Sequence, residues 1–403
     1  MHGICSRKGL VNSRQFLRAE PFRPRDKVKK KQDNSLKKIA NFANMKKKLL
    51  GKNLDELKEV ALEAGLPKFA GRQLADWLYV KKVRSIDEMT NISKSGRMAL
   101  GEKYEVGLCD YAVVHSSSDG TKKYLFPVKC SHRQGLNVGC NDDVPESGLE
   151  EGAIEAVMIP DGDRATLCVS SQSGCKMGCR FCMTGRQGFH GNMSACDIIS
   201  QIIAVEESDM LTNVVFMGMG EPLDNYDNVM RTIEILTADW GFAWSPKRIT
   251  VSSIGVLPNL KRYLEESKCH LAISLHNPFP EERLSVMPVQ KSWDIEKIIE
   301  LIRQYDFTGQ RRVSFEYTMF EGFNDSKRHA DALIRMLKGL ECRVNLIRFH
   351  KIPDFEMTTS SNIIIENFRQ RLNNSGLVAT IRASRGEDIL AACGMLAGQH
   401  KTL

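Results

Sequence analysis

The chain has 403 residues, of which 42% are hydrophobic and 26% are charged, which is ordinary for a globular enzyme with one large and one smaller domain. No run of about eighteen apolar residues occurs, so we expect no membrane-spanning helix and a cytoplasmic location. The net charge of +8 comes from residues 1–48, which hold fifteen Lys and Arg and three acids; the remainder has a net charge of −4, so overall charge does not indicate a nucleic-acid partner.

The basic segment 1–48 is poor in large apolar side chains, which predicts a disordered extension. It is open to three interpretations: a polyphosphate-binding arm, a transit peptide, or sequence upstream of the true start. It contains no apolar core of a secretory signal. Met45 is a natural opening for the first amphipathic stretch, so we favour a misassigned start or a dispensable tail.

Residues 49–108 predict a small helical domain, because apolar positions recur at three- and four-residue spacing and Gly65 and Pro67 close the first helix. This domain is either a substrate-handling or docking unit or an extension of the packing of the main domain. Residues 109–160 alternate apolar and polar side chains, which predicts short β-strands or a hairpin that connects to the main domain.

Residues 161–398 carry six apolar, β-branched runs separated by amphipathic stretches. The runs lie at 166–171, 213–218, 248–253, 270–275, 312–320 and 343–349. This alternation predicts an α/β fold with a parallel sheet that is closed or partly closed as a (β/α)6 barrel. Chemistry in such barrels lies on the loops that follow the strands, and the first of these loops holds a cluster of cysteines.

The last part of this region, 378–398, predicts a strand, a turn at Arg385–Gly386 and a helix-forming stretch that carries Cys393. The chain has twelve cysteines in no regular pairing. Without a secretory signal, a disulfide framework is not expected, and metal-binding or catalytic roles are favoured.

Cys175, Cys179 and Cys182 are spaced C-x3-C-x2-C on the loop after the first barrel strand. Three thiolates can hold a [4Fe-4S] cluster with one iron left open for a small molecule, because a fully protein-bound cluster takes four cysteines. A zinc site with Cys168 or Cys196 as fourth ligand, and a redox pair of Cys179 and Cys182, are the alternatives. The spacing favours the open iron–sulfur site.

This spacing resembles that of the radical S-adenosylmethionine (radical-SAM) enzymes. The segments CVSSQSGCKMGCRFCMTGRQGF, VVFMGMGEPLDN, ITVSSIGVLP, LAISLHNP and RASRGEDILAACGMLAG further resemble the RlmN-type adenine-C2 methyltransferases, over about residues 53–400. The resemblance implies methylation of C2 of an adenine in 23S rRNA and of the adenine next to the anticodon in tRNA. It also implies one [4Fe-4S] cluster with three cysteine ligands and two S-adenosylmethionine molecules per turnover.

The same resemblance implies roles for three further side chains. Cys393 would accept a methyl group that becomes a radical and adds to C2, joining protein and RNA covalently. Cys168 would then attack the Cys393 sulfur and release the product with a transient disulfide. Glu155 would take the proton from C2. Without the resemblance, both cysteines would be interpreted as small packing residues and Glu155 as a solvent-facing strand residue.

Seven positions align with family contacts to S-adenosylmethionine. Gly220 allows close backbone approach, and the Glu221 carboxylate suits the amino group. Ser252 and the run Ser274, Leu275 and His276 match contacts to the ribose, carboxylate and adenine. His350 stands where many relatives have asparagine followed by proline, which puts this contact in doubt.

Two other functions are considered. The sibling Cfr-like class methylates C8 of the same rRNA adenine with the same cysteines, and a non-catalytic zinc-stabilised RNA-binding module would have no need of Cys393. The expected partners are 23S rRNA, tRNA and an electron donor such as flavodoxin or ferredoxin, and we expect a monomer. RNA contacts are expected from the helical domain, at Lys68, Arg72, Lys81 and Lys82.

Overall fold

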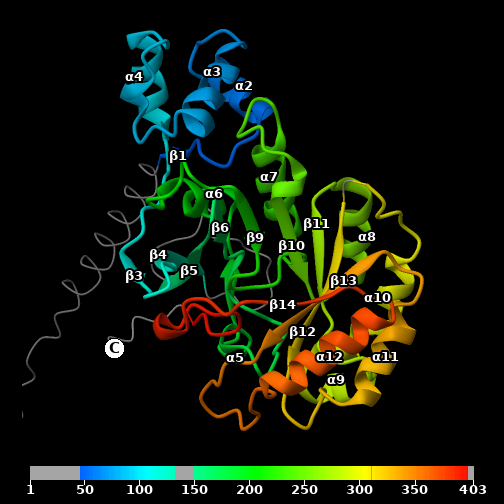
Figure 1. The fold of residues 1–403 in the computed structure, drawn as a ribbon. Coiled ribbons are helices and arrows are strands. Elements are labelled where there is room, and N and C mark those ends of the chain that lie inside the picture. The colour runs from blue at the N-terminus through cyan, green and yellow to red at the C-terminus, as the bar shows by residue number, and fades with distance from the viewer. Residues whose placement is uncertain (1–45, 132–148, 310, 398–403) are drawn as a thin grey trace, which may run out of the picture. The chain divides into compact units, whose positions relative to one another are not determined.

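The computed structural model describes residues 46–131, 149–309 and 311–397, which form part of one compact unit (Figure 1). Most of the predicted N-terminal extension, residues 1–45, lies outside the described residues. Lys47–Lys48 do not belong to that extension, because they form strand β1 and pair in parallel with β2 (Tyr104–Glu105). No helix in these described ranges is long and apolar enough to cross a membrane.

The predicted helical domain is confirmed, although its helices are short and irregular. They are α2 (Leu54–Glu63), α3 (Ala70–Ala75), the π-helix η1 (Asp76–Val80), the 3-10 helix η2 (Ile86–Glu88) and α4 (Lys94–Lys103). Asn53 begins α2 with a capping box: its side chain accepts from the Glu56 amide, and the Glu56 carboxylate accepts from the Asn53 amide. Arg231, on the helix α7 (Tyr226–Thr237), forms an ion pair with Glu56 and so connects this domain to the main one.

All six predicted strands are present and lie side by side in parallel, in chain order. They are β6 (Arg164–Cys168), β9 (Asn213–Phe216), β10 (Ile249–Ser253), β11 (His270–Ser274), β12 (Val313–Met319) and β13 (Cys342–Arg348). β14 (Ala379–Ile381) adds to β13, also in parallel. The carboxyl ends of these strands therefore meet at one end of the sheet, where the active site is expected.

The connecting segment 109–160 is more regular than expected. β4 (Lys122–Ser131) and β5 (Leu149–Asp161) are long antiparallel strands, and with β3 (Val113–Ser116) they extend the barrel sheet beyond β6 to ten strands. The ends of this sheet, β14 and β3, do not pair with one another, so the barrel is partial.

Helices alternate with the strands, as the amphipathic stretches predict (Figure 1). The longer ones are α6 (Ala195–Ala204), α7 (Tyr226–Thr237), α8 (Leu257–Glu266), α10 (Ile295–Ile302), α11 (Lys327–Leu337) and α12 (Asn362–Asn374). Shorter elements are the hairpin β7 (Gln172–Gly174) and β8 (Phe189–Asn192), α5 (Met183–Arg186), α9 (Pro280–Val286), η3 (Pro246–Arg248) and η4 (Pro288–Lys291).

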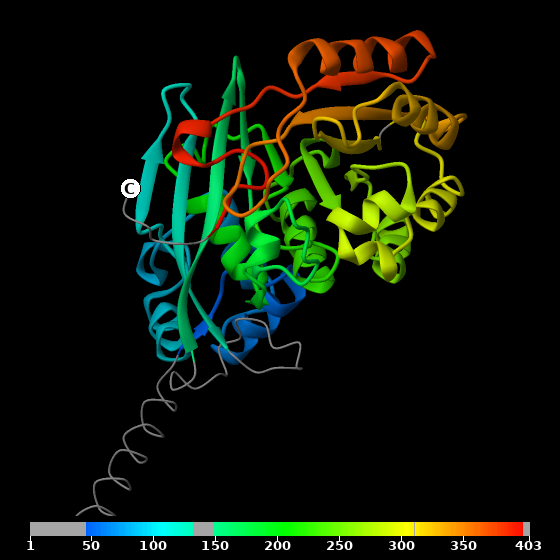
Figure 2. The ribbon, with the colours of Figure 1, turned by 90° about the horizontal axis from the view of Figure 1, so that it is seen from below.

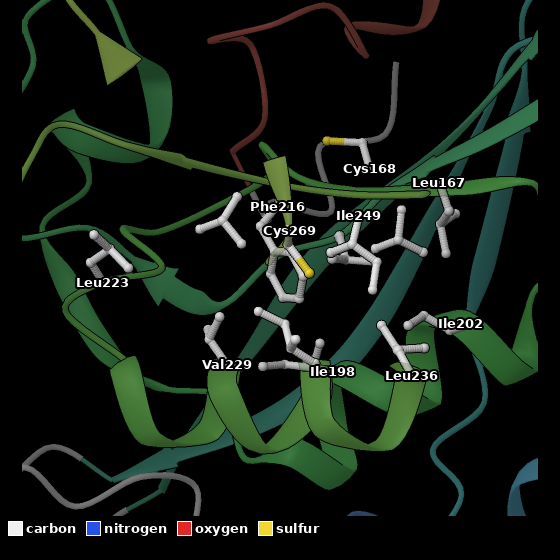
Figure 3. Close-up of a cluster of buried hydrophobic side chains, with 14 of the residues drawn as sticks. Leu167, Cys168, Ile198, Ile202, Phe216, Leu223, Val229, Leu236, Ile249 and Cys269 are labelled. Carbon is white, nitrogen blue, oxygen red and sulfur yellow. The ribbon is translucent and has the colours of Figure 1, made fainter. Parts of the chain in front are cut away.

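The core lies between the strands and the helices. Figure 3 shows Leu167 and Ile249 from the strands facing Ile198 and Leu236 from the helices, and all four side chains have no exposed surface. Burial of each such side chain contributes about 1.5–3 kcal/mol. Cys168 follows Leu167 and points to the other side of the sheet (Figure 3), as alternation along a strand requires. It therefore faces the barrel interior rather than the helices.

The segment after β14 contains no α-helix among the described residues, contrary to the predicted helix-forming stretch. A single 3-10 turn, η5 (Glu387–Ile389), is followed by Leu390 at φ +53° and irregular backbone to Ala397. Figure 2 shows this segment, in red, running from β14 back toward β3–β5. We call residues 382–397 the carrier segment, after the role that the family resemblance implies for Cys393.

Candidate active site

The three clustered cysteines lie at the carboxyl ends of the strands and line one cavity of about 170 Å³. Their loop requires glycine at 174, where φ is +72° and an added Cβ would lie 1.9 Å from the Gly188 carbonyl oxygen. The amide of Cys175 donates to that same oxygen at 2.7 Å. The close crossing of the hairpin β7–β8 therefore positions the first cysteine.

Among the described residues, this cavity does not present the compact ligand set of a structural zinc site. No three His, Cys, Asp or Glu side chains of the described residues are placed to hold a single metal ion. The proposed fourth zinc ligands also lie elsewhere: Cys168 lines a different cavity, and the Cys196 thiol donates to the Gly107 carbonyl at 3.1 Å. Burial raises the pKa of Cys179 to about 12, so deprotonation must accompany binding of a metal centre.

Gly220 and Glu221 line the same cavity. Gly220 has φ +97°, and an added Cβ would lie 2.5 Å from the Cβ of Gln172. Glu221 is 3% exposed, and its two carboxylate oxygens accept from the backbone amides of Leu223 and Ile254, both at 3.0 Å. Burial raises the pKa of Glu221 to about 7. A bound ammonium group would favour its ionised form.

Ser252, Ser274 and His276 also line this cavity. The His276 Nδ1 accepts from the Thr318 amide at 3.0 Å, and burial lowers the pKa of His276 to about 3, so the ring is neutral and its proton lies on Nε2. Leu275 is fully buried and does not line the cavity; its amide donates to the Glu316 carbonyl at 3.1 Å.

A second cavity of about 250 Å³ holds Cys168 and His350. Cys168 lies directly opposite Val157 in the β5–β6 ladder, and both line this cavity. His350 follows the end of β13, and its ring bonds to the Ser384 hydroxyl at 3.2 Å. His350 does not line the cavity of the three cluster cysteines, and its contact with S-adenosylmethionine stays a prediction.

Cys393 lines both cavities. Their other shared walls are Met217, Ile347 and Arg382, from the ends of β9 and β13 and the start of the carrier segment. Cys393 is exposed, whereas Cys168 is buried. Burial, and next the neighbouring Cys393, raise the pKa of Cys168 to about 12. The structure thus brings together the two cysteines whose local sequence would indicate only packing.

The carrier segment is held from two directions. On one side, the Met183 amide donates to the Gly394 carbonyl at 2.8 Å, and the Thr184 hydroxyl donates to the Leu396 carbonyl at 2.7 Å. These residues begin α5, directly after Cys182. On the other side, it is bound by the turn between β3 and β4. The Gly386 amide donates to the Asp119 carboxylate in this turn, and the Ser117 hydroxyl and the Ser118 amide donate to the Asp388 carboxylate. Cys393 is therefore fixed between the cysteine loop and the antiparallel strands.

Glu155 is 2% exposed and lines neither cavity. Its carboxylate accepts from the Ala397 amide at 2.9 Å and lies 3.4 Å from the Lys123 ammonium. It shares a face of β5 with Val157 and Ile159, which do line the second cavity. The Glu155 carboxylate therefore lies on the face of β5 that contributes to the cavity of Cys168.

Arg382 and Glu316 were missed by sequence reasoning. Arg382 lines both cavities. The nearby Cys393 raises the pKa of Arg382 above its usual range, with smaller contributions from Glu316 and Cys168, although burial acts to lower this pKa. Glu316 on β12 is 3% exposed, and one of its oxygens has no hydrogen-bond partner but lies 3.6 Å from Arg382. The sequence signal that could have indicated a functional role for Arg382 was its position in the same segment as Cys393.

The basic side chains expected to contact RNA are largely paired with acids. Arg72 lies 2.9 Å from Asp239, Lys81 2.8 Å from Asp76, and Lys82 2.7 Å from Asp209. These pairs reduce the positive charge that the helical domain offers to phosphates.

Two family models match the chain. The Radical SAM superfamily matches residues 169–333, and the ribosomal RNA large subunit methyltransferase N-terminal domain matches residues 47–106. The first match covers the cysteine loop and most of the parallel sheet, and the second covers the helical domain.

Similar proteins extend over most of the chain. A protein of Porphyromonas gingivalis named "Probable dual-specificity RNA methyltransferase RlmN" is 55% identical over 348 residues, which are 86% of this chain and 96% of the relative. The "Dual-specificity RNA methyltransferase RlmN" of Syntrophus aciditrophicus is 38% identical over 86% of this chain and 95% of its own. A crystal structure of a radical SAM methyltransferase from Sphaerobacter thermophilus superimposes with a TM-score of 0.77 at 35% identity, and covers 88% of this chain and all of that one.

Proposed function

Because the chain belongs to the RlmN family of radical-SAM RNA methyltransferases, we propose that it methylates C2 of one adenine in 23S rRNA and of the adenine beside the anticodon in tRNA. The observation that carries the proposal is the position of Cys393, which lines both the cavity of the three clustered cysteines and the cavity of Cys168. A methyl group on this sulfur could be activated from one side and released from the other.

Cys175, Cys179 and Cys182 would hold a [4Fe-4S] cluster, and the cavity that they line contains a buried carboxylate oxygen of Glu316 without a hydrogen-bond partner. Cluster and S-adenosylmethionine together supply the one-electron chemistry that activates a methyl C–H bond. Gly220 and Glu221 would receive the amino group of S-adenosylmethionine. Ser252, Ser274 and His276 would contact the rest of the molecule, and Leu275 would support them from behind.

Cys393 would carry the methyl group, two S-adenosylmethionine molecules being used per turnover. Once its carbon is bonded to C2, the adduct would lose one electron, returned to the iron–sulfur centre, and the C2 proton, which Glu155 would take. Cys168 would then attack the Cys393 sulfur, so that an S–S bond forms as the S–C bond breaks, and the released carbon would take up a proton to become the methyl group. An external thiol would then reduce the disulfide. Arg382 is placed to stabilise negative charge on either sulfur, because it interacts with both.

We further propose the domain organisation, the oligomeric state and the electron donor of this enzyme. They comprise a helical RNA-handling domain at 49–108, a connecting segment at 109–160, a barrel with its carrier segment at 161–398, a monomeric state, and a flavodoxin- or ferredoxin-like electron donor. Ribosomal and transfer RNA substrates make the cytoplasm the proposed site of action.

The test is anaerobic reconstitution with iron and sulfide, addition of S-adenosylmethionine, a reductant and RNA, and mass spectrometry of the RNA nucleosides. We expect 2-methyladenosine, and none from a Cys393→Ser variant that still binds the cluster. 8-Methyladenosine would instead identify the C8 class. A colourless zinc protein that leaves RNA unmodified would overturn the proposal.

A further inference from the structure

Arg283 on α9 is fully buried. Its Nε donates to the Leu275 carbonyl and its Nη2 to the Ser274 carbonyl, both at 3.0 Å. Nη1 donates to the Gln290 side-chain oxygen and, at 3.5 Å, to the Trp293 carbonyl. All four acceptors are neutral.

A buried guanidinium is ordinarily paired with a carboxylate, because an uncompensated buried charge costs several kcal/mol. Among the described residues, no acid forms an ion pair with Arg283. Asp294 acts on it only at longer range, since its oxygens accept from the Gln290 side chain and the Glu296 amide. Desolvation accordingly lowers the pKa of Arg283 to about 10, but this group still carries its charge at neutral pH.

The helix that carries Arg283 packs against the cysteine loop, where a negatively charged group could compensate the guanidinium. The Arg180 amide, between Cys179 and Cys182, donates to the Val286 carbonyl at the end of α9 at 2.9 Å. Met287, the next residue, lines the cavity of the three cysteines. Arg283 also donates to the carbonyl of Ser274, whose residue lines this same cavity. α9 therefore holds the guanidinium against the wall behind the cluster site.

We propose that Arg283 is the counter-charge of the iron–sulfur centre and raises its reduction potential. This inference rests on the proposed function, because it requires a cluster on Cys175, Cys179 and Cys182. A cluster with three thiolates is net negative, and one-electron reduction adds a further negative charge. A fixed cation in a low-dielectric wall stabilises the reduced state more than the oxidised one.

Arg283 also holds the carbonyls of Ser274 and Leu275, which end β11 beside the cofactor cavity. It is a positioning residue rather than a catalytic one, since it lines neither cavity. Charge and hydrogen bonding can be separated, because lysine keeps the charge without the planar fork of donors, whereas glutamine keeps a donor without the charge.

The experiment is a redox titration of the reconstituted cluster by electron paramagnetic resonance, without S-adenosylmethionine or RNA, in wild type and in Arg283→Lys, Arg283→Gln and Arg283→Met. We expect both neutral variants to lower the reduced-to-oxidised ratio at a fixed potential by about tenfold, which is about 59 mV for a one-electron couple. They should also lose iron to a chelator faster. Arg283→Lys should stay near wild type in both measurements.

Arg311→Met is the matched control. Arg311 also donates to backbone carbonyls, those of Leu264 and Ser267, but it lies before β12, at the opposite end of the strands. Its loss should reduce thermal stability without moving the potential. If Arg283→Met does not fold, Arg283→Gln and Arg283→Lys decide the outcome.

An unchanged potential in the folded neutral variants would overturn the inference, and so would an equal shift in Arg283→Lys. Either result would leave the proposed function intact. A wild-type protein that takes up no [4Fe-4S] cluster would overturn both.

Discussion

Cys168 and Cys393 come from opposite ends of the barrel domain, yet they line one cavity. Cys168 is the last residue of β6 and faces away from the helices, whereas Cys393 lies on irregular backbone that is tied to the cysteine loop at Gly394. Small apolar neighbours surround both in the sequence, so only their common cavity supports an exchange between the two sulfurs.

Replacement of Cys168 by alanine should trap a covalent protein–RNA adduct. The attack that releases the product requires this thiol, whereas transfer of carbon from Cys393 to the base does not. The adduct should appear as a slowly migrating band on denaturing gels that ribonuclease removes. Cys269→Ala, at a buried cysteine outside both cavities, is the control and should turn over normally. Absence of any adduct would count against the resolving role.

Replacement of Gly220 by alanine should weaken S-adenosylmethionine binding about tenfold or more. The added Cβ would collide with Gln172, whose side-chain oxygen accepts from the Glu221 amide at 2.9 Å, and the positive φ adds about 1–3 kcal/mol of strain. Gly376→Ala, at φ +85° with nothing within 4 Å of the added atom, carries the strain without the collision. Equilibrium binding of S-adenosylmethionine to both variants separates the two effects; equal losses would argue against a cofactor site at Gly220.

At the scale of elements, the carrier segment depends on the turn between β3 and β4. Asp388 accepts from the Ser117 hydroxyl at 2.6 Å and from the Ser118 amide at 3.1 Å. We expect Asp388→Ala to raise hydrogen exchange of residues 386–397 several-fold and to lower methylation without loss of the cluster. Asp239→Ala, which removes the partner of Arg72 in the helical domain, should leave exchange in this segment unchanged. Similar exchange in both variants would contradict the role of this contact.

The same contact predicts a dependence on pH. Burial alone would raise the pKa of Asp119, but hydrogen bonds from Thr121, Gly386 and Ser117 outweigh burial and hold this pKa below the usual range. The hydrogen bond from Ser117 likewise lowers the pKa of Asp388. Because the pKa values of both carboxyl groups are lower in the folded state, their ionised forms stabilise the attachment of the carrier segment. This stabilisation is fully present above the ordinary aspartate pKa of about 3.9 and is lost as the pH falls through the lower folded-state values. Exchange of residues 386–397, corrected for intrinsic rates, should stay constant from neutral pH to about 5. A rise near pH 6 would contradict this assignment.

At the scale of the whole molecule, residues 46–397 contain the helical domain, the barrel and the carrier segment in one unit, and the family matches begin at residue 47. We expect a chain that starts at Met45 to fold, to take up the cluster and to methylate RNA at the full rate at physiological salt. At low salt it should bind RNA more weakly, because the removed residues carry most of the excess positive charge. Loss of methylation at physiological salt would show that the basic segment takes part in the reaction.

The six parallel strands and the helical domain could be predicted from the amino-acid sequence because they depend on local periodicity, and the spacing within one loop singled out Cys175, Cys179 and Cys182 as candidate cluster ligands. The sequence did not determine the course of residues 382–397, where a helical pattern gave way to contacts with Asp119, Lys123 and Met183 from distant elements. Nor did it indicate Arg382 between two thiols, or Arg283 without an acid partner, because burial and the placement of charges follow from which strands and helices pack together. That Cys393 lines both cavities follows from how distant segments pack, and no local pattern around this residue predicts it.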